Sequence, residues 1–451
     1  MGMLTAGLSI LVYCTRTMAD PTTDRLDSEL SAIVNDPAEP LASLSVLAVR
    51  DGRPVYHRQF GFRRIDNAVP SRSLPADAAT LYRIASISKL VTSIGVMRLV
   101  EDGKLDLDAD VSGYLGFETR NPHFPDRPIT LRMMMSHTSS LRDNAGYYWD
   151  SAGGVTLRDV LVPGGKAHGP GAMWAGNAAP GDFFSYSNLP WGVIGTIMER
   201  VTGERFDRLM QRLVLVPMKL TGGFSPADMP VEDLANIATL YRKRPANDDS
   251  AAWNPTGPWI AQTDDFSTGF PAPRAGPDYV PGTNGTLFGP QGNCRLSAEG
   301  LGKVMLMLMN GGEIDGVRIL RSESVDLMLS EQWRDNGRNG NTGGEFSQGN
   351  IAAMNAWGLG AQRFRDISFG PGRGDRLVEP GGLFAVGHMG DAYGLTSAMV
   401  FDARRRIGLV FLVGGVGFDP AKTPGHYSAM RRYEERILTA LYRRAILEQV
   451  D

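Results

Sequence analysis

Strand-like runs stand near both ends of this 451-residue chain, and they constrain its fold more than any other feature. Residues 41–62 contain two apolar runs joined at Asp51-Gly52, a dipeptide typical of a two-residue hairpin turn. Further strands are predicted near the other end, at residues 357–364, 382–386, 396–401 and 407–413. We expect these strands to share one antiparallel sheet, and a final helix at 427–449 to pack on it.

The long middle of the chain, residues 86–290, has the patterns of helices and of Gly/Pro-rich loops. Leu90, Ile94 and Met97 recur at helical spacing, which predicts a helix that begins at about Ser86. These patterns predict an α/β (α+β) fold, an antiparallel sheet flanked by helices, with an inserted and mostly helical domain.

The predicted domain boundaries follow from this division. The α/β domain would consist of residues 25–85 and 291–451, and the inserted helical domain of residues 86–290. Residues 1–24 would form an N-terminal extension or a weak signal-like segment. A secretory signal requires Lys or Arg before its apolar run, and none precedes the short apolar run of this segment. The run is also too short to span a bilayer. We therefore expect a cytoplasmic protein without a stable membrane span; the alternative is a periplasmic or secreted one, if residues 1–19 act as a signal peptide.

Composition and charge exclude several classes of function. Apolar residues make up 42% of the chain and charged residues 21%, as is ordinary for a soluble globular protein. The formal net charge is −3 and no basic run with interleaved aromatics occurs, so nucleic acid is not an expected partner. The two cysteines and six histidines show no disulfide framework and no metal-ligand spacing, and we expect no cofactor and no metal. The oligomeric state does not follow from these features.

Ser86-Ile87-Ser88-Lys89 begins the predicted helix and carries a candidate nucleophile. One helical turn places the Ser86 hydroxyl and the Lys89 amine on the same face. A serine hydroxyl is a poor nucleophile until a neighbour takes its proton, and a desolvated lysine can do so. No other lysine in the chain has a serine three positions before it. The plainer alternative is an N-cap serine beside a solvated lysine.

Two further motifs follow along the chain. Tyr186-Ser187-Asn188 is the first, and no other tyrosine has an asparagine two positions later. Gly387-His388-Met389-Gly390-Asp391 is the second, between two of the predicted strands. The plainer alternatives are a core tyrosine beside a turn asparagine, and a histidine that packs at a strand end.

The order Ser-x-x-Lys, Tyr-x-Asn and basic residue-x-Gly resembles the three-motif signature of the penicillin-recognising serine enzymes. The flanking segments at 131–141, 185–203 and 296–329 resemble the branch related to class C β-lactamases, which includes serine esterases, D-aminopeptidases and DD-peptidases. The likeness covers residues 25 to about 440. It implies a β-lactamase/transpeptidase-like fold, in agreement with the predicted sheet and inserted helical domain.

The resemblance also implies catalytic roles. Ser86 would form an acyl-enzyme, and Lys89 and Tyr186 would share the proton transfers, with the identity of the base left open between them. Asn188 would hold the Lys89 amine with its carbonyl oxygen and a substrate carbonyl with its amide.

The third motif departs from the β-lactamase pattern, which mostly has Lys-Thr-Gly where this chain has His388-Met389-Gly390. We expect the triplet near a sheet edge that faces the serine, with the N–H groups of Asp391 and Ser86 as an oxyanion hole. A histidine is mostly neutral at pH 7, Met389 lacks the threonine hydroxyl, and Asp391 adds negative charge. These changes weaken the recognition of a substrate carboxylate at this position.

We therefore expect a serine hydrolase, and specifically a carboxylesterase that acts on small to medium acyl esters. A D-aminopeptidase, a DD-peptidase or a weak class C-like β-lactamase would use the same residues on an amide. A catalytically idle binding homologue is the alternative from another class, and the presence of all the motifs argues against it.

Overall fold

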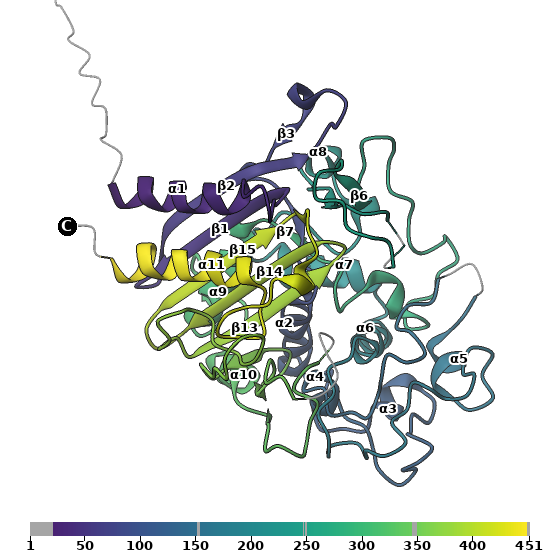
Figure 1. Cartoon of the computed structure of the whole chain (residues 1–451). Coiled ribbons are helices and arrows are strands. Elements are labelled where there is room, and N and C mark those ends of the chain that lie inside the picture. Colours follow the sequence, from purple (N-terminus) through teal and green to yellow (C-terminus); the bar gives the residue numbers. More distant parts are fainter. Residues whose placement is uncertain (1–20, 151–153, 247, 249, 345–349, 449–451) are drawn as a thin grey trace, which may run out of the picture.

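The computed structural model describes residues 21–150, 154–246, 248, 250–344 and 350–448. Its main feature is a nine-stranded antiparallel sheet with the order β10-β11-β12-β13-β14-β15-β1-β2-β3 (Figure 1). Its strands are β1 Ser43–Arg50, β2 Arg53–Arg64, β3 Leu74–Pro75, β10 Trp333–Arg334, β11 Ala356–Trp357, β12 Gln362–Phe364, β13 Ala385–Ala392, β14 Leu395–Asp402 and β15 Ile407–Val413.

The two ends of the chain meet in the middle of this sheet. β1 pairs with β15 so that Val46 lies opposite Phe411, and both side chains are fully buried. β1 and β2 are joined at Asp51 and Gly52, whose φ angles of 53° and 73° are those of a type I′ hairpin turn. The predicted sheet from both ends of the sequence, and with it the fold class, is therefore confirmed.

Helices cover both faces of the sheet. α1 (Pro21–Val34) and α11 (Arg432–Leu441, continued by a π-helical turn over Tyr442–Leu447) lie side by side on one face (Figure 1). On the other face lie α2 (Ile87–Glu101), α9 (Ala298–Met309) and α10 (Ser322–Leu329). α2 is buried along almost its whole length, so it forms the centre of the molecule.

The middle of the chain forms a group of mostly short helices beside the sheet (Figure 1). They are α3 Val111–Leu115, α4 Leu131–Met135, α5 Leu157–Leu161, α6 Leu189–Thr202, α7 Phe206–Met210 and α8 Val231–Ala235. One hydrophobic cluster runs from the sheet through α2 to α6 without a break. The boundaries at residues 85/86 and 290/291 therefore stay a prediction.

Short strand pairs complete the fold. They are β4 (Tyr82–Arg83) with β7 (Arg295–Leu296), β8 (Glu313–Ile314) with β9 (Val317–Arg318), and the sheet β16-β5-β6 of Gly415–Val416, Leu240–Arg242 and Ile260–Thr263. Residues 1–20 of the predicted N-terminal segment lie outside the described residues. Within the described ranges, no helix has both the length and the apolar character that are needed to cross a bilayer.

Three predicted elements differ from the structure. The strand expected at 357–364 is a tight hairpin, β11 and β12, because Gly358 and Gly360 turn the chain between them. The strand expected at 382–386 begins later, at Ala385, and runs on to Ala392, since pairing with β14 extends it through residues without strand propensity. The last helix begins at Arg432 rather than at 427. Glu434 in its first turn accepts from the backbone N–H of Arg431 at 2.8 Å and so fixes this start.

Candidate active site

Ser86 lies where the chain turns from β4 into the central helix α2. Ala85, directly before it, has a φ of 45°, a left-handed conformation that is strained for a residue with a side chain. The turn places Ser86 at the N-terminal end of α2. The helix dipole favours negative charge that develops at such a position.

Lys89 is fully buried one turn further along α2. Its Nζ donates to Ser86 Oγ at 2.9 Å, to Asn188 Oδ1 at 2.8 Å and to the backbone oxygen of Gln291 at 3.1 Å. An ammonium group has three N–H donors, so these acceptors offset much of the cost of burying its charge. One amine thus joins the first two sequence motifs.

Tyr186 lies against the same amine. Its ring centroid is 4.8 Å from Lys89 Nζ, within the range of a cation–π contact. His137 stacks on the tyrosine ring with 4.5 Å between centroids, and Trp357 packs edge-on at 5.7 Å. These neighbours fix the ring beside the positive charge of Lys89.

Asp143 fixes the orientation of Asn188 at the start of α6. Its carboxylate accepts from the backbone N–H groups of Asn188 at 2.8 and 2.9 Å and of Leu189 at 2.9 Å, and from Asn188 Nδ2 at 3.0 Å. Asn188 Oδ1 consequently points to Lys89, as the motif predicts. One amide hydrogen is used by Asp143, so only the other is available for the expected contact with a substrate carbonyl.

The third motif lies inside β13, where the sheet has an open edge. β12 pairs with β13 only at residues 385–387, whereas β14 pairs with residues 386–392. Residues 388–392 therefore have a strand neighbour on one side only among the described strands. A Cβ at Gly390 would lie 2.7 Å from the backbone oxygen of Ile84, so glycine is needed for β13 to pass beside the segment that leads to Ser86. The triplet is near an edge, as predicted, but within a strand.

His388 offers the site a neutral acceptor in place of a cation. Its Nδ1 contacts the backbone oxygen of Met389, which favours the tautomer with the proton on Nδ1. Burial and the nearby charge of Lys89 lower the pKa of His388 to about 3. In the part of the chain that the structure describes, its Nε2 has no hydrogen-bond partner. The ring centroid is 6.2 Å from that of Tyr186, so this acceptor lies near the candidate base.

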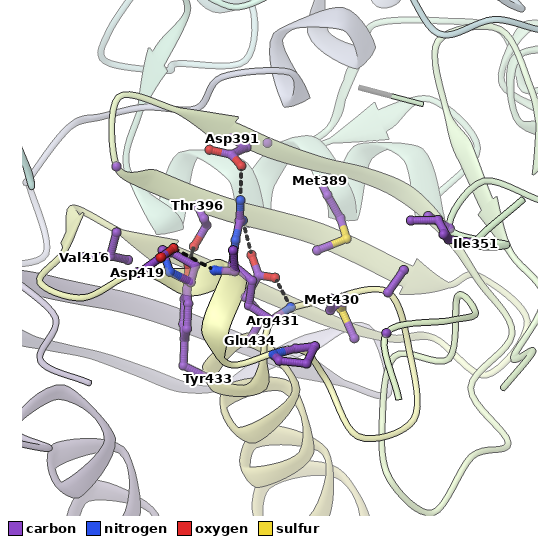
Figure 2. Close-up of a pocket in the computed structure, with 18 of the residues that line it drawn as sticks. Ile351, Met389, Asp391, Thr396, Val416, Asp419, Met430, Arg431, Tyr433 and Glu434 are labelled. Carbon is purple, nitrogen blue, oxygen red and sulfur yellow. Dashed lines mark hydrogen bonds and ion pairs between the residues drawn. The ribbon is translucent and has the colours of Figure 1, made fainter. Parts of the chain in front are cut away.

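The charge of Asp391 is balanced by a cation that the sequence motif does not reveal. Its carboxylate forms an ion pair with Arg431, which also contacts Glu434 in the first turn of α11 (Figure 2). Met389 and Asp391 both project from β13 toward α11, where a cavity of about 460 Å³ opens (Figure 2). The added negative charge that the sequence predicts is therefore offset, although the threonine hydroxyl is still missing.

The structure brings Ser86, Lys89, Tyr186, Asn188 and the β13 motif into one place, and it adds residues that sequence reasoning missed. His137, which supports the tyrosine ring, lies in the segment 131–141 that carries the resemblance. The positioning residues that the motifs did not reveal are Asp143, Gln291 and Arg431. None of them belongs to a motif, and loop packing brings each to the site, so their spacing carries no signal. Among the described residues, no three His, Cys, Asp or Glu side chains gather as a metal ion would require.

The fold and the site together define a protein of the serine β-lactamase fold. The family described as Beta-lactamase matches residues 31–429. Because this match covers most of the sequence, the chain belongs to the β-lactamase family, as its three motifs indicate.

Individual relatives include both an esterase and a penicillin-binding protein. The chain is 29% identical to esterase EstB of Burkholderia gladioli over 230 residues, 48% of this chain and 57% of the esterase. It is 27% identical to penicillin-binding protein 4* of Bacillus subtilis (strain 168) over 179 residues, 38% of this chain and 36% of that protein. The chain thus spans between about a third and somewhat over half of these relatives. The octameric penicillin-binding protein homologue from Pyrococcus abyssi has a TM-score of 0.59 at 20% identity, over 88% of this chain and 74% of that chain, which shows a shared fold.

Proposed function

We propose that this protein is a serine carboxylesterase that forms an acyl-enzyme on Ser86. The observation that carries the proposal is the Lys89 amine, 2.9 Å from the Ser86 hydroxyl and 4.8 Å from the centre of the Tyr186 ring. The serine proton then has an acceptor within reach, either Lys89 in its neutral form or a Tyr186 phenolate that Lys89 stabilises.

The base takes up a proton and returns it twice in this reaction, once in acylation and once in deacylation. Ser86 Oγ loses its proton to the base and attacks the ester carbonyl, and the same group returns the proton to the departing alcohol. A water molecule then loses a proton to the base and attacks the acyl carbonyl. The acid leaves Ser86, and the base returns that proton to Ser86 Oγ. The backbone N–H groups of Ser86 and Asp391 are assigned to the oxyanion, with the N-terminal end of α2 adding to the favourable field.

Several features support an ester as the substrate. At the third motif His388 is neutral, Met389 has no hydroxyl, and Arg431 is already paired with Asp391 and Glu434. This position therefore lacks the cation and hydroxyl that would hold the carboxylate of a penicillin. The partial similarity to esterase EstB agrees with this choice.

Covalent labelling tests the nucleophile. We expect a fluorophosphonate probe to modify Ser86 alone, as located by peptide mass spectrometry, and Ser86→Ala to abolish labelling and ester turnover. Ser88→Ala, on the same helix, is the matched control and should still be labelled. An adduct on another serine, or an active Ser86→Ala variant, would contradict the assignment.

A substrate panel tests the reaction class. Turnover of p-nitrophenyl esters would be compared with that of nitrocefin and of D-amino acid p-nitroanilides. The similarity to penicillin-binding protein 4* is the reason to include the amides. Amide or β-lactam turnover above ester turnover would replace the esterase assignment with a peptidase or β-lactamase one, and labelled but inactive protein would favour a binding homologue.

A further inference from the structure

A second cavity, of about 470 Å³, lies beside the segment that leads to Ser86, and its walls are rich in arginine. Arg83, Arg274 and Arg295 line it, and the acidic residues of its lining are Asp264 and Asp265. The proposed reaction uses none of these side chains. We call this cavity the arginine pocket.

The inner wall of the arginine pocket contains one carboxylate between two guanidinium groups. Arg83 donates to Asp264 through Nε at 3.1 Å and Nη2 at 2.7 Å, and Arg295 donates through Nη2 at 2.7 Å. All three residues are buried. Asn293 accepts further N–H groups of both arginines through Oδ1 and its backbone oxygen. These acceptors are neutral, so the two guanidinium groups and one carboxylate keep an excess positive charge, which a further anion would offset. Within the described residues, Arg295 Nε also has no hydrogen-bond partner.

The outer wall adds a third cation, Arg274, and one tyrosine, Tyr148. Arg274 lies 6.0 Å from the ring centroid of Tyr148, and Arg83 lies 5.4 Å from that of Tyr393. Tyr148 is 45% exposed, so this side of the cavity is accessible, and Tyr393 beside Arg83 is 49% exposed. Asp265 is exposed, and solvent screens its charge more than that of the buried groups. Burial and the charge of Arg83 lower the pKa of Arg274, as expected where like charges crowd.

We propose that the arginine pocket binds a carboxylate carried by the ester substrate, a proposal that rests on the esterase function. Guanidinium groups match a carboxylate with paired N–H donors, and tyrosine hydroxyls add further ones. Arg83 lies three residues before Ser86, so their Cα atoms are at most about 11 Å apart. In this proposal the aliphatic chain of the substrate extends from an ester carbonyl at Ser86 to a carboxylate held in the pocket. The arginine pocket then binds the substrate carboxylate, and the neutral third motif does not need to bind it.

Kinetics with matched esters tests the proposal. The p-nitrophenyl monoester of adipic acid carries a distal carboxylate, and its methyl ester has the same chain without the charge. We expect kcat/KM to favour the charged ester by about tenfold, mainly through KM, because charge-assisted hydrogen bonds are among the stronger ones. A second pair, 3-carboxyphenyl and phenyl hexanoate, places the charge on the leaving group. Preference for the charged member of either pair supports the proposal.

Substitution of a pocket arginine tests whether the preference for the charged ester arises in this pocket. Arg274→Gln should reduce the preference for the charged ester to about one, and Arg274→Lys should retain part of it. Arg318→Gln removes a charge from the exposed β8–β9 hairpin and is the matched control, so the preference should remain. Circular dichroism melting of each variant checks the fold. Turnover of neutral esters with no preference for a charged one, or a preference that survives Arg274→Gln, would overturn the proposal.

Direct binding separates this proposal from the esterase assignment. If no ester is hydrolysed, the esterase assignment fails, and calorimetric titration of adipate into the whole protein decides on the pocket. We expect binding by the wild type that weakens about tenfold in Arg274→Gln and persists in Arg318→Gln. Inorganic phosphate is titrated in parallel. Absence of adipate binding, or equal binding of phosphate, would contradict a carboxylate site.

Discussion

Lys89 is buried among acceptors that come from three separate parts of the chain. Ser86 belongs to the same helix, Asn188 begins α6, and Gln291 lies in the loop before β7. An amine held by three acceptors has a defined orientation, which a proton transfer requires. Tyr186 borders the same amine, so the two candidate bases form one unit.

Replacing both candidate bases tests whether they act together. Lys89→Ala and Tyr186→Phe should each lower kcat for a p-nitrophenyl ester by about 10² or more, since each removes a group from one proton transfer. The double variant should lose little more than the worse single variant, because residues that act as a unit are not additive. A loss equal to the product of the two single losses would show that they act in separate steps.

Substrate choice depends on the residues of the third motif. We expect kcat/KM for esters to exceed that for nitrocefin by about three orders of magnitude, or about 4 kcal/mol of transition-state binding. His388→Lys with Met389→Thr should narrow this gap, because the pair restores a charge and a hydroxyl. Steady-state kinetics on both substrates measures the ratio, and efficient nitrocefin hydrolysis by the wild type would reverse the ranking.

At the scale of elements, α6 connects the site to the loop that follows the inserted helices. It begins beside Asn188 and carries the fully buried Glu199 near its other end. Glu199 accepts from the Tyr279 hydroxyl at 2.6 Å and from the backbone N–H groups of Gly282 and Phe206 at 2.8 Å. One carboxyl group therefore holds the 279–282 loop and the start of α7 on α6.

This carboxyl group should make stability depend on pH. Burial raises the pKa of Glu199 from 4.5 to about 7, so between these values the folded protein keeps a proton that the unfolded chain releases. The corresponding stability is complete below pH 4.5 and is lost as the pH rises through 7. Relative to Glu199→Gln, the wild type should lose up to about 3 kcal/mol of unfolding free energy between pH 4.5 and 8.

Urea denaturation at several pH values measures this difference. Glu232→Gln, an exposed position on α8, is the control and should follow the wild type at each pH. A constant difference between wild type and Glu199→Gln across the pH range would show that Glu199 does not titrate in this window.

At the scale of the whole molecule, the sheet joins the two ends of the chain and also supports the site. Ser397 on β14 donates to the backbone oxygen of Ile84, two residues before Ser86. β13 carries the third motif and pairs with the same β14. Disruption of the sheet is therefore expected to displace the candidate nucleophile and the strand that faces it.

Phe411 at the junction of β15 with β1 tests this coupling. Phe411→Ala should lower the free energy of unfolding by about 3–5 kcal/mol, because it opens a cavity in a fully buried position. Phe384→Ala, at a side chain that is 63% exposed, should change it by less than about 0.5 kcal/mol. Loss of Ser86 labelling should coincide with loss of circular dichroism in denaturant, and labelling that persists after the sheet unfolds would contradict the coupling.

Local patterns in the sequence determined the fold class and the central part of the candidate site. The Asp51-Gly52 turn, the helix after Ser86 and the order of the three motifs are properties of short stretches, where propensity and spacing act within a few residues. The geometry joins Ser86, Lys89, Tyr186 and Asn188 as the motifs predicted.

Only the tertiary structure decided what surrounds these residues. Positions far apart in the sequence are joined in three places. They are the ion pair of Asp391 with Arg431, the hydrogen bond of Asn188 to Asp143, and the arginine pocket. β13 likewise extends through the third motif because β14 pairs with it, against the low strand propensity of its residues. Charge balance and strand pairing depend on which residues contact each other in the folded protein. Motif spacing and composition in a single sequence do not predict such contacts between distant residues.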